Sequence, residues 1–223
     1  MIALLQDEKQ RLNTLVQFET EKRNQGYQQI AGVDEAGRGP LAGPVVAAAC
    51  IIPEGLFFEG INDSKQLTDA QRRKLFDQIV KAEGVKFGVA IVTAFVIDTI
   101  NILQATIKAM LDAVAQIEPD YLLVDGLQLP HPNLPSLKII KGDARSQSIA
   151  AASVLAKVTR DNLMLDYHKQ WPDYGFESHK GYGTKRHIQA LTALGPCEIH
   201  RMSFEPIKSM NTKSTLNLTQ LVY

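Results

Sequence analysis

The sequence predicts an α/β fold, a mixed β-sheet with helices on both faces, because two strand-like segments follow one another and strands then alternate with helical segments. The chain has 223 residues, within the usual range for one domain. Of these residues 45% are hydrophobic and 22% are charged, so the chain can build a substantial core. The predicted architecture adds an N-terminal helix before the sheet and a helical region after it.

Each element has its own local signal. An amphipathic helix is expected over residues 2–24, where Leu12, Leu15 and Val16 face one way with Leu5. Thr68 and Gln71 form a capping box that begins a helix ending near Gly84. Short apolar runs predict strands near 28–35, 43–52, 85–93, 121–125 and 137–142. Further helices are expected near 95–117 (stopped by Pro119), 144–171 (before Pro172) and 185–194, with a glycine-rich loop over 174–183.

These elements indicate three regions. Residues 1–27 form an N-terminal helical extension, 28–210 one catalytic domain that includes C-terminal helices, and 211–223 a loose tail rich in Thr, Asn and Ser. No repeat and no linker is visible in the sequence.

Composition argues against a membrane or a secreted protein. No apolar run approaches the roughly 20 residues of a membrane span, and the N-terminus lacks the layout of a signal peptide. Two cysteines, Cys50 and Cys197, lie far apart, without a C-x-x-C motif or a framework of pairs. A reducing cytoplasm is therefore expected, and a monomer is our working expectation.

Charge is balanced overall but unevenly distributed. Residues 1–137 hold 12 Lys and Arg against 17 Asp and Glu, whereas residues 138–223 hold 12 against 7. This asymmetry suggests an acidic, metal-binding part and a basic part that binds a nucleic-acid backbone. A chance imbalance on solvated surfaces is the alternative. Because strong duplex binders usually carry more positive charge, we expect modest, salt-sensitive affinity.

The segment from Ile30 to Leu41, IAGVDEAGRGPL, is the most informative in the chain. An apolar strand delivers two adjacent acids, Asp34 and Glu35, which are costly to desolvate without a cation. Oxygen ligands suit Mg²⁺ or Mn²⁺. A Gly-Arg-Gly loop follows at once and suits a phosphate or sugar. An isolated Asp-Glu pair is more often a solvated turn.

The same loop also matches G-x-G-x-x-A through Gly37, Gly39 and Ala42, a weak dinucleotide-binding fingerprint. That fingerprint needs a helix directly after the glycines. Here Pro40 is followed by a second apolar strand, so we reject the dinucleotide interpretation.

Two further acids follow strand-like runs. Asp125 ends YLLVD, and Asp143 follows LKIIKG. Each segment resembles a buried strand whose C-terminal end presents one carboxylate. Taken alone, Asp143 could instead be the N-cap of the next helix. Together with Asp34 and Glu35, the pattern favours a site of four carboxylates.

The sequence is similar to bacterial ribonuclease HII, the type 2 ribonuclease H family. The resemblance runs from about Ile30 to Phe204 in the expected order. It rests on six segments: DEAGRGPLAGPVVAAA, NDSKQLT, NILQAT, LLVDG, KGDARSQSIAAASVLAKVTRD and HKGYGTKRH. The first and fifth are long and specific. The type 3 ribonucleases H are the family most easily mistaken for type 2. Their loop after the paired acids lacks Gly-Arg-Gly, and they carry an extra N-terminal domain.

This resemblance implies a ribonuclease H-like fold and a metal-dependent endonuclease. Its substrates would be RNA–DNA hybrids and duplex DNA containing ribonucleotides, cut on the 5′ side of the ribonucleotide by two Mg²⁺ or Mn²⁺ ions. The implied ligands are Asp34, Glu35, Asp125 and Asp143. The implied substrate contacts are the backbone of Gly37, Arg38 and Gly39 at the 2′-hydroxyl and Tyr182 stacked on the following sugar.

Six residues in the matching segments are possible phosphate contacts: Lys65, Asn101, Lys141, Ser153, Lys157 and Arg160. Lys157 and Arg160 are three apart on a helix and share a face. Solvated structural charge explains each equally well. The histidines His179, His187 and His200 are not spaced as a zinc site, and we assign them no metal.

Two other functions remain open from sequence. A binding module for RNA-containing duplexes would not need four acids. A resolvase-like or integrase-like nuclease on the same fold would have no 2′-hydroxyl to recognise, so the Gly-Arg-Gly loop and Tyr182 discriminate against it.

Overall fold

The computed structural model describes residues 2–210, and the predicted tail at 211–223 lies outside that range. The described chain divides into two compact units. The first comprises the segment up to Ala36, Val46–Ile91 and Thr106–Thr159, and the second comprises Gly37–Val45, Val92–Ala105 and the chain from Arg160 onward. The helices of the N-terminal extension belong to the first unit. The predicted boundaries at 28 and 210 stay a prediction.

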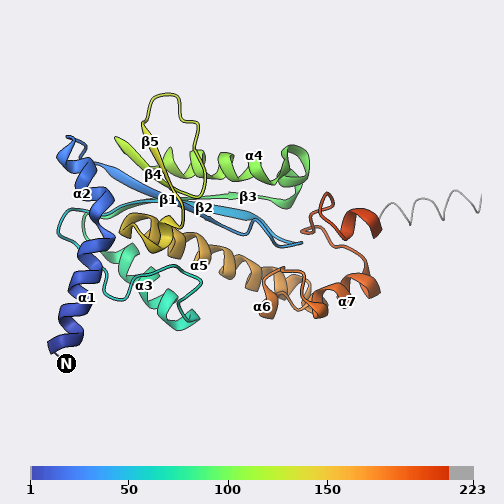
Figure 1. Cartoon of the computed structure of the whole chain (residues 1–223). Helices are drawn as coiled ribbons and strands as arrows, with labels where there is room; N and C mark the ends of the chain where they lie inside the picture. The colour runs from blue at the N-terminus through green and yellow to red at the C-terminus, as the bar shows by residue number, and fades with distance from the viewer. Residues whose placement is uncertain (1, 211–223) are drawn as a thin grey trace, which may run out of the picture. The chain divides into compact units, whose positions relative to one another are not determined.

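A five-stranded mixed sheet forms the first unit, as the sequence predicts. The strand order is β3-β2-β1-β4-β5. β1 is antiparallel to β2 and parallel to β4, and β4 is parallel to β5. The bounds are β1 Ile30–Ala36, β2 Val45–Ile51, β3 Lys86–Val92, β4 Tyr121–Asp125 and β5 Ser136–Ile139. Figure 1 shows this sheet between α5 and the C-terminal half of α4.

The centre of the sheet is apolar and tightly packed. All seven residues of β2 are buried, and so are the first five of β1. The Cα of Gly32 lies so close to α5 (Gln147–Gln170) that an added Cβ would be 2.1 Å from the carbonyl carbon of Ser148. Only glycine fits such a contact, so β1 and the first turns of α5 are held at a fixed, short separation.

The N-terminal segment folds as two helices rather than the single predicted one. α1 spans Ile2–Leu15 and α2 spans Gln17–Asn24, and between them Val16 has non-helical angles of φ −102° and ψ 9°. The prediction for α3 is confirmed. It spans Asp69–Lys81, and both hydrogen bonds of the predicted capping box are present.

The helix predicted over 95–117 contains a break. α4 spans Ala94–Val114, but Asn101 has φ 67° and ψ 164°. The Asn101 side chain accepts hydrogen bonds from the backbone N–H groups of Leu103 and Gln104, at 3.0 and 3.1 Å. It therefore acts as an N-cap for the second half of the helix.

α4 is the only helix in the described range that meets the length and composition of a membrane span, and 33% of its apolar window is buried. The sequence analysis expected no such run. One helix of this kind is weak evidence, because core helices have the same composition. The break at Asn101 also leaves neither half near the roughly 20 residues a span requires.

The second unit is mainly helical and has its own core. It contains the end of α5, the short helices η2 Pro172–Tyr174 and α6 Phe176–His179, and α7 Lys185–Leu194, which matches its predicted bounds. The segment predicted as a glycine-rich loop is thus partly helical. The core residues are Leu41, Ala42, Met164, Tyr174, Phe176, Leu191, Ile199 and Ile207.

Candidate active site

Strand register brings the first two acids together. In the parallel pair β1–β4, Val33 lies opposite Val124. Asp34 and Asp125 are each the next residue along and so occupy neighbouring positions on adjacent strands. Asp34 is buried, at 4% exposure, and Asp125 is half-buried.

Asp143 reaches the same place from a turn rather than a strand. β5 ends at Ile139, earlier than predicted, and Lys141 then adopts a left-handed conformation at φ 55°. Asp143 sits in the following 3-10 turn, η1 Gly142–Ala144. The N–H of Gly142 donates to the Asp125 carboxylate at 2.5 Å, which ties this turn to β4.

Asp143 does not act as the N-cap of α5. The hydroxyl of Ser146 accepts a hydrogen bond from the N–H of Ile149 at 3.2 Å, so Ser146 caps α5. The carboxylate of Asp143 therefore has no capping role at α5.

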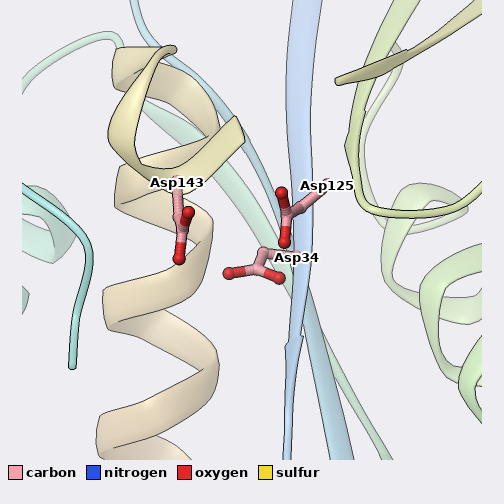
Figure 2. A group of neighbouring side chains, drawn as sticks. All are labelled: Asp34, Asp125 and Asp143. Atoms are coloured by element: carbon pink, nitrogen blue, oxygen red, sulfur yellow. The ribbon is translucent and has the colours of Figure 1, made fainter. Parts of the chain in front are cut away.

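The three aspartates Asp34, Asp125 and Asp143 form a compact carboxylate group. One oxygen from each lies within 4.8 Å of the others, close enough to hold a single metal ion. Figure 2 shows the three side chains pointing toward one another between the sheet and the start of α5. Glu35, the fourth predicted ligand, follows Asp34 on β1, is half-buried and is not one of this group.

The electrostatics of the group are unfavourable without a cation. Burial, followed by the negative charges of Glu35 and Asp125, holds the pKa of Asp34 well above its ordinary value. Burial and the charge of Asp125 also raise the pKa of Asp143. The Lys65 ammonium, 3.6 Å from an Asp143 oxygen, offsets part of this charge. Converging, desolvated oxygen ligands are the donor set that Mg²⁺ and Mn²⁺ prefer, so the residues present fit such an ion.

Two residues beside this group, Asp63 and Ser64, are not among the predicted site residues, and Ser153 is predicted only as a phosphate contact. Asp63 forms a side-chain hydrogen bond with Asp143. Ser153 on α5 hydrogen-bonds to the Asp34 carboxylate and, at 2.8 Å, to the Ser64 hydroxyl. Asp63 and Ser64 stand in the NDSK segment, from which only Lys65 was selected, so the motif itself was the available signal.

In the second unit, two buried arginines organise the Gly-Arg-Gly loop. The Arg201 guanidinium donates to the carbonyl oxygens of Gly37, Arg38 and Gly43, at 2.5, 2.8 and 3.0 Å. An added Cβ at Gly37, whose φ is +96°, would lie 2.1 Å from Arg160 Nε. The loop backbone is thus fixed from beneath, while Arg38 and Gly39 remain exposed.

The predicted phosphate contact of Arg160 is wrong, and so is the alternative of a solvated charge. Arg160 is 1% exposed. Its guanidinium donates to the carbonyls of Pro44, Lys180 and Ala42, at 3.0, 3.0 and 3.1 Å. Because these bonds and its burial leave it out of reach of a phosphate, Arg160 has a structural role. Lys157 is half-buried on α5, and its phosphate contact stays a prediction.

Tyr182 lies in the same unit, with 45% of its surface exposed. Its ring is beside the loop, because a Cβ added at Gly39 would be 3.8 Å from the ring. The Arg160 guanidinium lies 5.9 Å from the ring centroid. Tyr182 therefore presents an aromatic surface next to Gly39, and its contact with a sugar stays a prediction.

A cluster of three buried histidines supports the Tyr182 segment. His187 Nδ1 is 3.0 Å from the Tyr182 carbonyl oxygen, and His187 Nε2 is 3.0 Å from His200 Nε2. His179 stacks on His187, with ring centroids 4.5 Å apart. Burial lowers the pKa of both His187 and His200 to about 4. That these histidines bind no metal stays a prediction.

Comparison with known proteins agrees with these observations. A family model described as Ribonuclease HII matches residues 31–207. Ribonuclease HII of Chlamydia trachomatis serovar L2 is 59% identical over 193 residues, 86% of this chain and 88% of the relative. Ribonuclease HII of Chlamydia abortus is 53% identical over 212 residues, 94% of this chain and the whole of the relative.

Solved structures show the same fold. The ribonuclease H2 of Pyrococcus horikoshii superposes with a TM-score of 0.69 at 28% identity, over 83% of this chain and 98% of that one. Ribonuclease HII of Archaeoglobus fulgidus, solved in complex with PCNA, gives 0.67 at 23% identity, over 79% and 95%. The match of the family model to most of the chain, together with these identities, shows that the chain belongs to the ribonuclease HII family.

Proposed function

We propose that the chain cuts duplex DNA on the 5′ side of single embedded ribonucleotides as well as the RNA strand of RNA–DNA hybrids, leaving 5′-phosphate and 3′-hydroxyl ends. Family membership makes it a hydrolytic endonuclease with ribonuclease H activity. The observation that carries the proposal is the convergence of three aspartates, two of them buried, from β1, β4 and η1. Such a group is costly in a structural core and useful for binding a cation.

We infer that Asp34, Glu35, Asp125 and Asp143 hold two ions, Mg²⁺ or Mn²⁺. When bound, such ions would lower the pKa of the attacking water and stabilise the negative charge that develops on the leaving oxygen. The protein keeps the ligands in place. Gly142 orients Asp125, and Ser153 and the N–H of Glu35 orient Asp34, the latter at 2.7 Å.

Recognition of RNA must involve the 2′-hydroxyl, since this group distinguishes RNA from DNA. We propose that the backbone of Gly37, Arg38 and Gly39 contacts it and that Tyr182 stacks on the next sugar. Two observations support this. Arg201 fixes the loop by two of its carbonyls, and the Tyr182 ring is exposed beside Gly39. Lys65, beside Asp143, and Lys157 are further candidates for phosphate contacts.

We also propose a cytoplasmic monomer with no membrane association. Cys50 and Cys197 are both free thiols, which agrees with a reducing compartment.

The test replaces each proposed ligand by its neutral isostere: Asp34→Asn, Glu35→Gln, Asp125→Asn and Asp143→Asn. Asp112→Asn is the matched control, because Asp112 is an exposed carboxylate paired with Lys108 on α4. Each ligand variant should lose most cleavage of a hybrid at saturating Mg²⁺ and stay folded, while the control keeps wild-type turnover. A ligand variant with near-wild-type turnover would remove that residue from the essential set.

A further inference from the structure

Glu19 of α2 is a buried carboxylate outside the predicted catalytic domain, at 4% exposure. Its Oε1 atom accepts three hydrogen bonds, from the Ser146 hydroxyl at 2.7 Å, the Ser148 hydroxyl at 2.6 Å and the Ser148 N–H at 3.0 Å. Its Oε2 atom is buried and has no hydrogen-bond partner among residues 2–210. A buried carboxyl group with one unsatisfied oxygen is costly, so Glu19 is a candidate for a specific task.

The three donors belong to Ser146, which caps α5, and to Ser148 in the first turn of α5, directly after the turn that carries Asp143. A carboxylate at this place is favoured by the unpaired N–H groups and the dipole at a helix N-terminus. Ser146 caps α5 by its bond to Ile149, and it also closes the preceding turn, because its N–H donates to the Gly142 carbonyl at 2.8 Å. Glu19 therefore holds the residue that links the Asp143 turn to α5.

The turn is consequently held at both ends. At its start the N–H of Gly142 is bonded to Asp125. At its end the hydroxyl of Ser146 is bonded to Glu19. Asp143 lies between these two anchors. Loss of the second anchor would free the turn to rotate about the first and would move Asp143 relative to Asp34 and Asp125.

We propose that Glu19 is a positioning residue for Asp143, so that the N-terminal extension takes part in building the metal site. This rests on the proposed role of Asp143 as a ligand. Every site residue that the sequence predicts lies at or after Asp34, so none of them belongs to this extension. Residues that orient metal ligands typically change metal affinity by roughly 10–100-fold when they are replaced.

The test measures Mn²⁺ binding to the full chain by titration calorimetry without substrate. Glu19→Ala should weaken Mn²⁺ binding at least about tenfold, whereas Glu19→Gln, which keeps an acceptor oxygen, should stay close to wild type. Glu21→Ala on the same helix is the control, because Glu21 is exposed. A Glu19→Ala protein that is less stable but binds Mn²⁺ as wild type does would overturn the proposal.

A double-mutant cycle separates this inference from the assignment of Asp143. If Glu19 acts through Asp143, then Glu19→Ala should weaken Mn²⁺ binding no further in an Asp143→Asn background. Equal losses in both backgrounds would mean an independent effect and would refute the inference alone. If Asp143→Asn leaves the affinity unchanged, the ligand assignment falls and the inference falls with it.

A second variant covers failure of Glu19→Ala to fold. Ser146→Gly removes the hydroxyl that is bonded to Glu19, at an N-cap position where glycine is well tolerated. A loss of Mn²⁺ affinity, again absent in the Asp143→Asn background, is expected. No loss in Ser146→Gly would contradict the proposal.

Discussion

Individual buried arginines, rather than the exposed residues themselves, fix the shape of the Gly-Arg-Gly loop. Arg160 and Arg201 are 1% and 0% exposed, and together they donate to six backbone carbonyls. A planar guanidinium offers several donors in fixed directions, which an ammonium cannot reproduce. Burial and the charge of Arg160 lower the pKa of Arg201 to about 9, so this arrangement is maintained against an electrostatic cost.

Arg201→Lys should therefore destabilise the folded protein although it keeps a positive charge. Each buried carbonyl left without a donor costs about 1–3 kcal/mol, so the free energy of unfolding should fall by several kcal/mol. Lys169→Ala is the control, because Lys169 is 76% exposed in its ion pair with Asp166. Urea denaturation of both variants measures this. An Arg201→Lys protein as stable as wild type would show that the guanidinium geometry is dispensable.

Tyr182→Ala should reduce cleavage at a single embedded ribonucleotide more than cleavage of a long RNA–DNA hybrid. A stacking contact contributes on the order of 1–3 kcal/mol, which is roughly tenfold to hundredfold in rate. A long hybrid offers many registers and does not depend on one sugar. Tyr182→Phe keeps the ring and is the control. The ratio of turnover on the two substrates, at one stated salt concentration, is the measurement, and equal losses on both would refute junction sensing.

At the scale of elements, the histidine cluster links α6, α7 and the Tyr182 segment in the second unit. His187 and His200 share a hydrogen bond at 3.0 Å between their Nε2 atoms, which requires one of the two nitrogens to lack a proton. His187 Nδ1 donates to the Tyr182 carbonyl in the neutral tautomer that fits this arrangement. Protonating both rings would place two N–H groups face to face and break the link.

Acid should accordingly destabilise this protein. The pKa of His187 and of His200 is lowered from 6.5 to about 4 on folding, so the unfolded chain binds more protons between these values. The free energy of unfolding is fully retained above pH 6.5 and should fall as the pH drops toward 4, by about 1.4 kcal/mol per pH unit for each histidine.

Denaturant unfolding at pH 7, 6 and 5 measures this dependence. A His187→Asn/His200→Asn double variant should show a shallower fall than wild type, whereas His131→Gln should not. Parallel pH profiles for wild type and the double variant would contradict the assignment of the acid sensitivity to this cluster.

Features that depend on residues close together in the sequence could be predicted, whereas contacts between distant residues could not. Asp125 ends the apolar strand β4 and Asp34 lies near the end of β1, and the capping box at Thr68 is local, so each was predictable. Asp143 was placed at a strand end, but a left-handed Lys141 ends the strand early and moves Asp143 into a turn.

Long-range contacts were out of reach of the sequence. The bonds from Glu19 to Ser148 and from Arg201 to Gly37 join residues 129 and 164 positions apart. No periodicity or motif in the sequence indicates that such distant residues are in contact. The sequence around an arginine on a helix also does not distinguish a buried guanidinium from a solvated one. For that reason Arg160 was assigned to the substrate and Glu19 was not selected at all.

At the scale of the whole molecule, family membership and local geometry support one activity. The matched region, residues 31–207, contains all the proposed ligands and the Tyr182 segment. Glu19 lies outside the matched region, yet it contacts the first turn of α5. The N-terminal helices should therefore influence metal affinity without changing where the substrate is cut.

A cleavage map on duplex DNA containing one ribonucleotide, with an all-DNA duplex beside it and Mg²⁺ and Mn²⁺ compared, tests the proposed activity. We predict one cut on the 5′ side of the ribonucleotide, a 3′-hydroxyl and a 5′-phosphate at the ends, no cut in the all-DNA duplex, and no activity after chelation of divalent ions. Cleavage of the all-DNA duplex, a cut elsewhere, or full activity in the chelator would contradict the account.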